Sequence, residues 1–381
     1  MSGRIPSERR RDVLKSIGIG AAGAFGITGI HSVAGHGTER PEYEVYSEVE
    51  GANTTVSDPE AADIAVFGGN SEVDHSLVAG AVNGGTAVGF VGSEANQRLL
   101  SALLGTSPGR ASEMNSRPRG VDDIDHSFGY EYDPDASANV AIALPEENGT
   151  LALHTDAGRY VSDEQRFATV LEEFETYSTS SSSGGRGGYS SEWEYDGRTK
   201  STNNHCPGGD LVRIVWAYEV PTEPGTVSFA WQDRMTPSVN DESSCDSYYK
   251  YRNSQAMRRP EFGPYDGDVI DFGPTTTKSS KTANVRMSSE GGASVGYSYE
   301  IEEVDIKASE STEDQAIKWE HDVDYYSSTA KTTFVSEPGI VVDYDGDPDT
   351  VKFRNENAYT WQHYDRFVTA KGDREFTWNF D

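Results

Sequence analysis

A serine hydrolase pattern, G-x-S-x-G, occurs at Gly292–Gly296 around Ser294. In hydrolases this pattern places a nucleophilic serine on a sharp turn, with a strand before it and a helix after it. The residues after Ser294 instead alternate between apolar and polar side chains, which predicts a strand. We therefore interpret Ser294 as a hydroxyl on the polar face of a strand, and we expect no catalytic residue and no enzymatic activity. An extracellular hydrolase is the weakest of our three functional hypotheses.

An acidic run near the C-terminus resembles a calcium-binding loop. Its carboxylates are Asp343, Asp345, Asp347 and Asp349. The order of acids found in an EF-hand is absent, and no glutamate occupies the twelfth position. A solvated acidic turn is the favoured interpretation, so these residues are only a weak candidate metal site. We expect no cofactor.

The chain has two cysteines, Cys206 and Cys245. We predict that they form a disulfide with each other, because cysteines of exported proteins meet an oxidising environment. Closing that loop would stabilise the fold by roughly 3–4 kcal/mol. Two free thiols are the alternative.

Residues 1–34 have the features of a cleaved signal peptide. Arg10 and Arg11 begin a twin-arginine pattern, a Gly-rich apolar run follows, and small residues precede Ala34. The twin-arginine route exports folded proteins. We therefore expect the mature chain to fold in the cytoplasm and to function outside the cell.

The chain is strongly acidic, with a formal net charge of −31. The signal peptide has five basic and two acidic residues, so the mature chain carries about −34. Only ten lysines accompany 22 arginines. Such surfaces suit molar salt, where the Debye length is about 3 Å and self-repulsion costs little. The composition indicates a halophilic, archaeal source, and it argues against nucleic acid as a partner.

The sequence predicts a two-domain α+β fold. Residues 35–177 alternate strand and helix patterns, which predicts a small α/β domain. Residues 178–188 form a Ser/Gly tract typical of a flexible linker. Residues 189–381 consist of strand patterns separated by Pro, Gly and Asp turns, which predicts a β-sandwich.

An amphipathic hairpin is predicted within the sandwich, at about 275–305. A three-residue turn at 290–292 would pair Ser289 with Ala293 and Met287 with Val295. This register separates the apolar from the polar side chains. The apolar face comprises Ala283, Val285, Met287, Ala293, Val295, Tyr297, Tyr299 and Ile301. The polar face includes Asn284, Arg286, Ser294, Ser298 and Glu300.

Two environments produce this alternation. One is a sandwich hairpin with one face on the core and one in water. The other is the stem of a membrane pore, with the apolar face toward lipid and the polar face toward the lumen. Tyr359, Trp361 and Tyr364 are candidates for an aromatic edge that contacts a membrane, although a core and rim position in one strand fits them equally.

The segment Gly292–Val323, "GASVGYSYEIEEVDIKASESTEDQAIKWEHDV", resembles the stem and post-stem region of the leukocidin/α-hemolysin-type β-pore-forming toxins. The terminal "REFTWNFD" is similar to the closing strand of that family. The resemblance covers about 275–381. It implies a sandwich with a stem hairpin folded against it, and soluble monomers that form a ring on a membrane and release their stems. The chain departs from the family pattern in its N-terminal α/β domain, in the short sandwich before the stem, in which no lipid-headgroup pocket can be placed, and in the short stem. In a pore, Lys281 must lie at the base of the barrel.

The first functional hypothesis is a secreted cytolysin-like protein that binds a target-cell membrane, forms a homo-oligomer and perforates the membrane. The alternative is a secreted or surface-associated binding or adhesion module without enzymatic activity.

Overall fold

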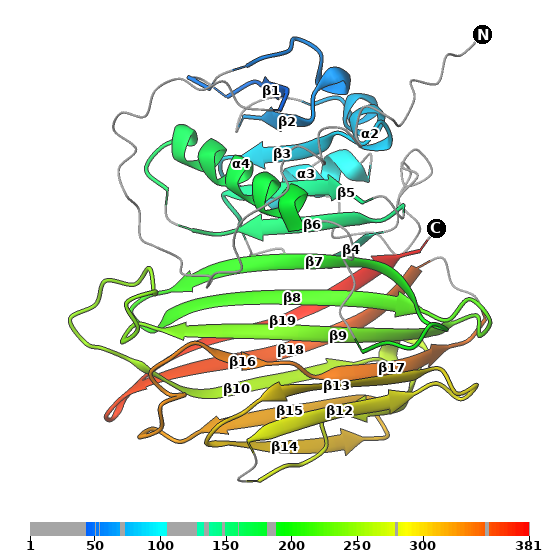
Figure 1. Cartoon of the computed structure of the whole chain (residues 1–381), viewed down its shortest axis with the longest axis vertical. Helices are drawn as coiled ribbons and strands as arrows, with labels where there is room; N and C mark the ends of the chain where they lie inside the picture. Colours follow the sequence, from blue (N-terminus) through cyan, green and yellow to red (C-terminus); the bar gives the residue numbers. More distant parts are fainter. Residues whose placement is uncertain are drawn as a thin grey trace.

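The computed structural model describes residues 43–49, 51–52, 54–68, 73–104, 128–132, 137–146, 149–158, 160–180, 188–278, 281–346 and 350–380. Strands dominate these ranges, and a small α/β region precedes a sandwich-like arrangement of sheets, as the sequence predicts (Figure 1). Residues 1–34, assigned to the signal peptide, lie outside the described residues. Of the helices in the described ranges, none combines the length and the apolar character needed to cross a bilayer.

The described part of the N-terminal region is built on five strands of one sheet, with helices on both faces. Its strands are β1 (Val45–Ser47), β2 (Ile64–Phe67), β3 (Ala87–Val91), β5 (Val140–Pro145) and β6 (Leu151–Asp156). Its helices are α2 (His75–Asn83), α3 (Ala95–Leu103) and α4 (Asp163–Ser180), with a short 3₁₀ turn, η1 (Pro59–Ala61). The strands are apolar on both faces because α2 and α3 cover one face and α4 covers the other.

The same sheet continues into the C-terminal region without a break. Strand β6 pairs in parallel with β7 (Glu194–His205), and the order is β1-β2-β3-β5-β6-β7-β8-β9-β17-β11, with β16 also paired to β9. The added strands are β8 (Gly209–Glu219), β9 (Thr226–Pro237), β11 (Gly267–Gly273), β16 (Phe334–Ser336) and β17 (Gly339–Tyr344). The predicted linker, 178–188, is described only at its ends. Ser178–Ser180 belong to α4, which corrects the start of the linker.

A second sheet packs against the C-terminal part of the first. Its order is β14-β15-β10-β18-β19-β4. The strands are β14 (Val304–Ser311), β15 (Ala316–Val323), β10 (Arg252–Glu261), β18 (Thr350–His363), β19 (Arg366–Asn379) and β4 (Phe128–Tyr132), and the 3₁₀ turn η4 (Gly263–Tyr265) precedes β11. Aromatic side chains from both sheets, including Trp231, Phe229, Phe353 and Trp319, fill the space between them. Burying such large side chains supplies most of the energy that holds the two layers together.

Strands β12 (Thr282–Ser288) and β13 (Ser294–Glu300) form a separate two-stranded sheet. In Figure 1 this hairpin lies near β14 and β15, at the end of the molecule away from the α/β region. Neither strand belongs to the ladder of the long sheet or of the second sheet. Side-chain packing and a few isolated hydrogen bonds therefore hold the hairpin in place.

Candidate functional site

The hairpin has the register that the sequence predicts. Met287 pairs with Val295, and Val285 pairs with Tyr297. The amide of Ser289 donates to the carbonyl of Ala293 over 2.9 Å, which leaves 290–292 as the turn. This pairing puts the predicted apolar residues on one face, because directly opposite residues share a face.

The two faces of the hairpin have opposite environments. Seven of the eight predicted apolar positions are buried, and Tyr297 is half-buried; the buried ones are Ala283, Val285, Met287, Ala293, Val295, Tyr299 and Ile301. All eight pack into the main core cluster. The predicted polar positions Asn284, Arg286, Ser294, Ser298 and Glu300 are all exposed. The hairpin is thus an outer layer with one dry face and one wet face.

Two glycines beneath the hairpin allow it to approach the long sheet closely. Gly273 of β11 and Gly339 of β17 are direct partners in that sheet. A Cβ atom on Gly339 would lie 2.7 Å from Met287 Cε and 2.8 Å from Tyr297 Oη. A Cβ atom on Gly273 would lie 3.0 Å from Val285 Cα. Since ordinary carbon contacts are about 3.5–4.0 Å, any side chain at these positions pushes against the hairpin.

A buried polar contact connects the hairpin to both sheets. The hydroxyl of Tyr299 lies 3.0 Å from Nε2 of His321 on β15, and the hydroxyl of Ser336 on β16 lies 3.1 Å from the same nitrogen. The pKa of His321 is lowered to about 4, mainly by burial and in smaller part by the nearby Arg258, while Asp233 opposes the shift. The ring is therefore neutral at physiological pH.

An ion pair lies deeper between the sheets. Arg258 of β10 donates from Nε and Nη2 to the two carboxylate oxygens of Asp233 on β9, over 3.0 and 2.6 Å. Arg258 Nη2 also donates to the hydroxyl of Tyr359 over 3.1 Å, and the guanidinium lies 5.3 Å from the Trp231 ring centroid. Burial would lower the pKa of Arg258, but Asp233 holds the pKa above its ordinary value. This pair fixes the two sheets to each other and leaves the hairpin outside.

A short strap, Gly188–Ser190, runs along the outer edge of β13. Gly296 donates its amide to the carbonyl of Gly188 over 2.8 Å, and Ser190 donates to the carbonyl of Ser294 over 2.9 Å. Tyr189 of the strap stacks on Tyr218 of β8, with ring centroids 3.6 Å apart. The strap therefore binds the hairpin edge while its own tyrosine is anchored on the sandwich.

Carboxylates hold the turn end of the hairpin. Glu223, in the loop between β8 and β9, accepts hydrogen bonds from the Ser289 hydroxyl (3.0 Å) and the Gly291 amide (3.1 Å). Asp271 of β11 accepts from the Ser288 amide over 2.9 Å. These bonds are directional and partly exposed, so each contributes about 1–2 kcal/mol at most.

The other chemical candidates have no catalytic or ligating geometry in the described residues. Ser294 begins a strand, β13, so its G-x-S-x-G pattern does not form a nucleophile elbow. Asp343 lies within β17, and one of its carboxylate oxygens accepts a hydrogen bond from the Thr226 hydroxyl. Asp345 follows the end of that strand. Asp347 and Asp349 lie outside the described residues. Within the described ranges no three His, Cys, Asp or Glu side chains are grouped as metal ligands would be.

The aromatic edge proposed from the sequence is corrected at two of its three positions. Tyr359 and Trp361 are fully buried because they share the inward face of β18 with Val351 and Phe353. Tyr364, in the turn after β18, is 73% exposed.

Other exposed tyrosines cluster with Tyr364, and the sequence analysis missed them. Tyr248 is 93% exposed and Tyr326 is 83% exposed. Tyr364 donates its amide to the hydroxyl of Tyr325, over 3.2 Å, and the rings of Tyr249 and His363 lie 5.4 Å apart in a tilted arrangement. We call this set the tyrosine end; it comprises Tyr248, Tyr249, Tyr325, Tyr326, Tyr364 and Phe367. Two Tyr-Tyr pairs in polar loops, 248–249 and 325–326, are the sequence signal that marks it.

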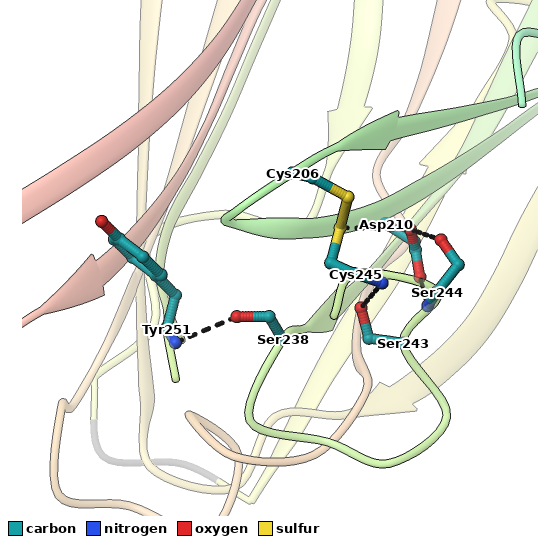
Figure 2. The surroundings of a disulfide bond; sticks show 7 residues. All are labelled: Cys206, Asp210, Ser238, Ser243, Ser244, Cys245 and Tyr251. Atoms are coloured by element: carbon teal, nitrogen blue, oxygen red, sulfur yellow. Dashed lines mark hydrogen bonds between the residues drawn. A yellow bond between two sulfur atoms is a disulfide. The ribbon is translucent and has the colours of Figure 1, made fainter. Parts of the chain in front are cut away.

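The predicted disulfide is present (Figure 2), and its Cys245 lies in the loop between β9 and β10 that also carries Tyr248. Cys206, after β7, bonds Cys245 with a Cα–Cα distance of 5.3 Å. Asp210 accepts from the amide and the hydroxyl of Ser244, over 2.6 and 2.7 Å. Farther along the loop, the Tyr251 amide donates to the Ser238 hydroxyl over 3.0 Å. These bonds hold the loop against the β7–β8 turn.

Comparisons with known proteins give only distant likenesses. No family model matches the sequence, and no curated protein matches it. Among solved structures, the chain is similar to the Clostridium perfringens delta-toxin at 11% identity and a TM-score of 0.29, over 49% of this chain and 88% of the toxin. A structure described as a pore forming protein gives 10% identity and a TM-score of 0.28, over 47% of this chain and 89% of the other.

Proposed function

We propose that this chain is an exported, non-enzymatic protein that perforates membranes by releasing the β12–β13 hairpin from the sandwich and inserting it into lipid. The observation that carries the proposal is the hairpin itself. It is apolar on one face and hydrated on the other, and it lies outside both large hydrogen-bonded sheets. Removing it breaks few backbone hydrogen bonds.

The length of the hairpin suits a bilayer. Paired residues extend from Lys281 and Ile301 at the open end to Ser289 and Ala293 at the turn, which is nine residues in each arm. At about 3.3 Å per residue an arm is about 30 Å long, and a tilt of about 40° reduces its height to about 23 Å. That height approaches the apolar band of about 25 Å in membrane-spanning strands. Lys281 lies at the open end, where a charge meets headgroups and costs about 0–1 kcal/mol.

The energetics favour a ring over a single inserted hairpin. Undocking exposes five large buried side chains, at about 1.5–3 kcal/mol each, so release alone costs on the order of 10 kcal/mol. Lipid covers the same face and offsets that cost. A lone hairpin would still leave unpaired backbone groups along its edges, at several kcal/mol each in hydrocarbon. Identical hairpins from neighbouring copies satisfy those groups, so we propose a homo-oligomer.

The tyrosine end supports a first contact with the target membrane. Tyrosine rings are enriched where headgroups meet the apolar layer, because the ring is apolar and the hydroxyl is polar. Arg366 and Arg252 lie over the rings of Tyr249 and Tyr325, at 4.2 and 4.7 Å. The predicted export signal and the acid-rich composition support a protein that acts outside the cell in high salt.

A disulfide lock tests the proposal. Ser190 and Ser294 face each other across the strap and β13, with the Ser294 amide donating to Ser190 Oγ over 3.0 Å. We expect the oxidised double variant Ser190→Cys, Ser294→Cys to bind liposomes without releasing a trapped dye, and we expect a reductant to restore release. The wild-type protein with and without reductant controls for loss of the native disulfide. Ser190→Ala, Ser294→Ala controls for the loss of two hydroxyls.

The outcomes separate the hypotheses. Dye release by the fully oxidised lock, at the wild-type rate, would show that the hairpin need not leave. If the wild-type protein binds liposomes but gives neither dye release nor detergent-resistant rings in high salt, the binding module is the better description. Deleting 282–299 adds a second criterion, because it should abolish release and leave the sandwich folded.

A further inference from the structure

A cavity of about 80 Å³ lies between the α/β region and the sandwich, far from the hairpin. Helix α3 and strands β6, β7 and β8 line one side, and β4 and β19 line the other. One ordered water needs about 10–15 Å³ of such volume, so the cavity has room for roughly five to eight waters. A small ion or a small organic acid fits that space.

The wall that β7 contributes to this cavity is polar where a sandwich strand is normally apolar. Thr199, Ser201 and Asn203 occupy three successive positions on one face of β7. They are opposite Val215, Arg213 and Leu211 of β8, which are buried. Inner faces of sandwiches usually carry apolar side chains. Within the described residues, no side-chain hydrogen bond satisfies Ser201 or Asn203, so this row of donors is available to a ligand.

Positive charge converges on the same cavity. Arg213 Nη1 and Arg374 Nη1 both contact a single oxygen, Oε2 of Glu131, at 3.2 and 3.5 Å. The Arg213 side chain is only 4% exposed, and its Nε has no hydrogen-bond partner among the described residues. Lys200 is also at the cavity wall, but its ammonium contacts Glu173 at 2.7 Å. Two arginines of different sheets thus meet at one carboxylate oxygen, and the buried Arg213 keeps an N–H donor toward the cavity that no described group accepts.

Neighbouring titratable groups are consistent with that positive field. Burial would raise the pKa of Glu131, but Arg213, Arg374 and Arg258 hold it below its ordinary value. Burial also lowers the pKa of His205, and Arg213 and Arg374 lower it further.

We propose that this cavity binds a small oxygen-bearing anion, such as a carboxylate, sulfate or phosphate. Arginine forks recognise planar and tetrahedral oxyanions through paired N–H donors, and the hydroxyls and amide of β7 supply further donors. The anion would accept from the Arg213 Nε, which is buried and lacks a partner among the described residues. Because the donors come from both the long sheet and β19 of the second sheet, binding stabilises the junction between them.

Calorimetric titration of the folded full chain tests this assignment, with acetate, malonate, sulfate and phosphate added separately at constant ionic strength. We expect saturable binding of one anion per chain for at least one of them. Ser201→Ala with Asn203→Ala should weaken that binding about tenfold, as the loss of one or two hydrogen bonds to a charged group implies. Arg213→Gln should abolish it. Arg354→Gln, which alters an exposed pair with Asp373, is the matched control and should bind as wild type.

Two results would overturn the proposal. One is the absence of saturable heat with every anion. The other is binding that persists unchanged in Ser201→Ala, Asn203→Ala, a variant that leaves the Arg–Glu contacts intact and is therefore informative even if Arg213→Gln does not fold. General stabilisation by sulfate, equal in all variants, would count against a specific site, because sulfate strengthens burial in any protein.

Discussion

A valine at Gly339 should act as a wedge under the hairpin. The added Cβ would lie 2.7 Å from Met287 Cε and 2.8 Å from Tyr297 Oη, about 1 Å closer than ordinary contact. The backbone of Gly339 is not in the left-handed region, so β17 itself accepts a side chain. Overpacking of this kind typically costs about 1–3 kcal/mol. Most of that strain falls on the docked hairpin.

The same 1–3 kcal/mol shifts the balance between docked and released hairpin by about 5- to 150-fold. We therefore expect Gly339→Val to release dye from liposomes faster than wild type at limiting lipid. Amide hydrogen exchange should accelerate within 282–300 and remain slow in β9 and β18. Gly296→Val is the matched control, since a Cβ on Gly296 meets nothing within 4 Å and points to the wet face.

A different pattern would refute the reasoning. If Gly339→Val accelerates exchange through β9, β17 and β18 together and lowers dye release, the hairpin is an inseparable part of the core. The docked state would then be the only folded state, and the binding module would be favoured.

Acid should promote release, because burial holds the pKa of His321 at about 4, the Tyr299 hydroxyl of the docked hairpin lies on its Nε2, and a solvated histidine titrates near 6.5. A His321 ring that release exposes to water binds a proton below pH 6.5 that the docked ring does not, so docking weakens as pH falls toward 4, by at most about 3 kcal/mol. His321→Gln should flatten this pH dependence of dye release. Tyr248→Ser with Tyr326→Ser should reduce liposome binding in a flotation assay at least tenfold without changing the thermal midpoint, and unchanged binding would remove the tyrosine end from the membrane contact. Cys206→Ser with Cys245→Ser should lower the free energy of unfolding by about 4 kcal/mol in a denaturant titration, since the bond closes a loop with a sequence separation of 39 residues; a change below 1 kcal/mol would contradict this estimate.

The hairpin register was predictable because it is local. A period of two with a glycine turn allows one pairing that separates Val285 and Val295 from Arg286 and Ser294, and a slip by one residue would reverse the faces. The docking surface was not predictable. No local pattern relates Gly273 and Gly339 to the hairpin residues that pack on them, and the contact of Tyr299 with His321 depends on how two sheets pack.

Strand phase explains the error at Tyr359 and Trp361. Alternation shows that these two side chains share a face of the strand, opposite Thr360 and Gln362. It does not show whether that aromatic face packs on the core or lies at a membrane-facing surface. The extension of one sheet through β6 and β7 was equally hidden, because parallel pairing between distant segments leaves no periodic signal. The tyrosine end is formed by residues of three loops that are separate in sequence. The Tyr-Tyr pairs at 248–249 and 325–326 are the sequence feature that indicates it.

The strap has a consequence for solubility as well as for release. An uncovered strand edge is a template for another chain, and β13 would present one to every neighbouring copy. Gly188 and Ser190 occupy the first part of that edge, from Ser294 to Gly296, and while they do so another copy of the chain cannot pair there. Under the proposed function, the strap Gly188–Ser190 would leave the edge of β13 only when the hairpin undocks. That edge would then be exposed at the moment when it can pair with the hairpin of a neighbouring copy.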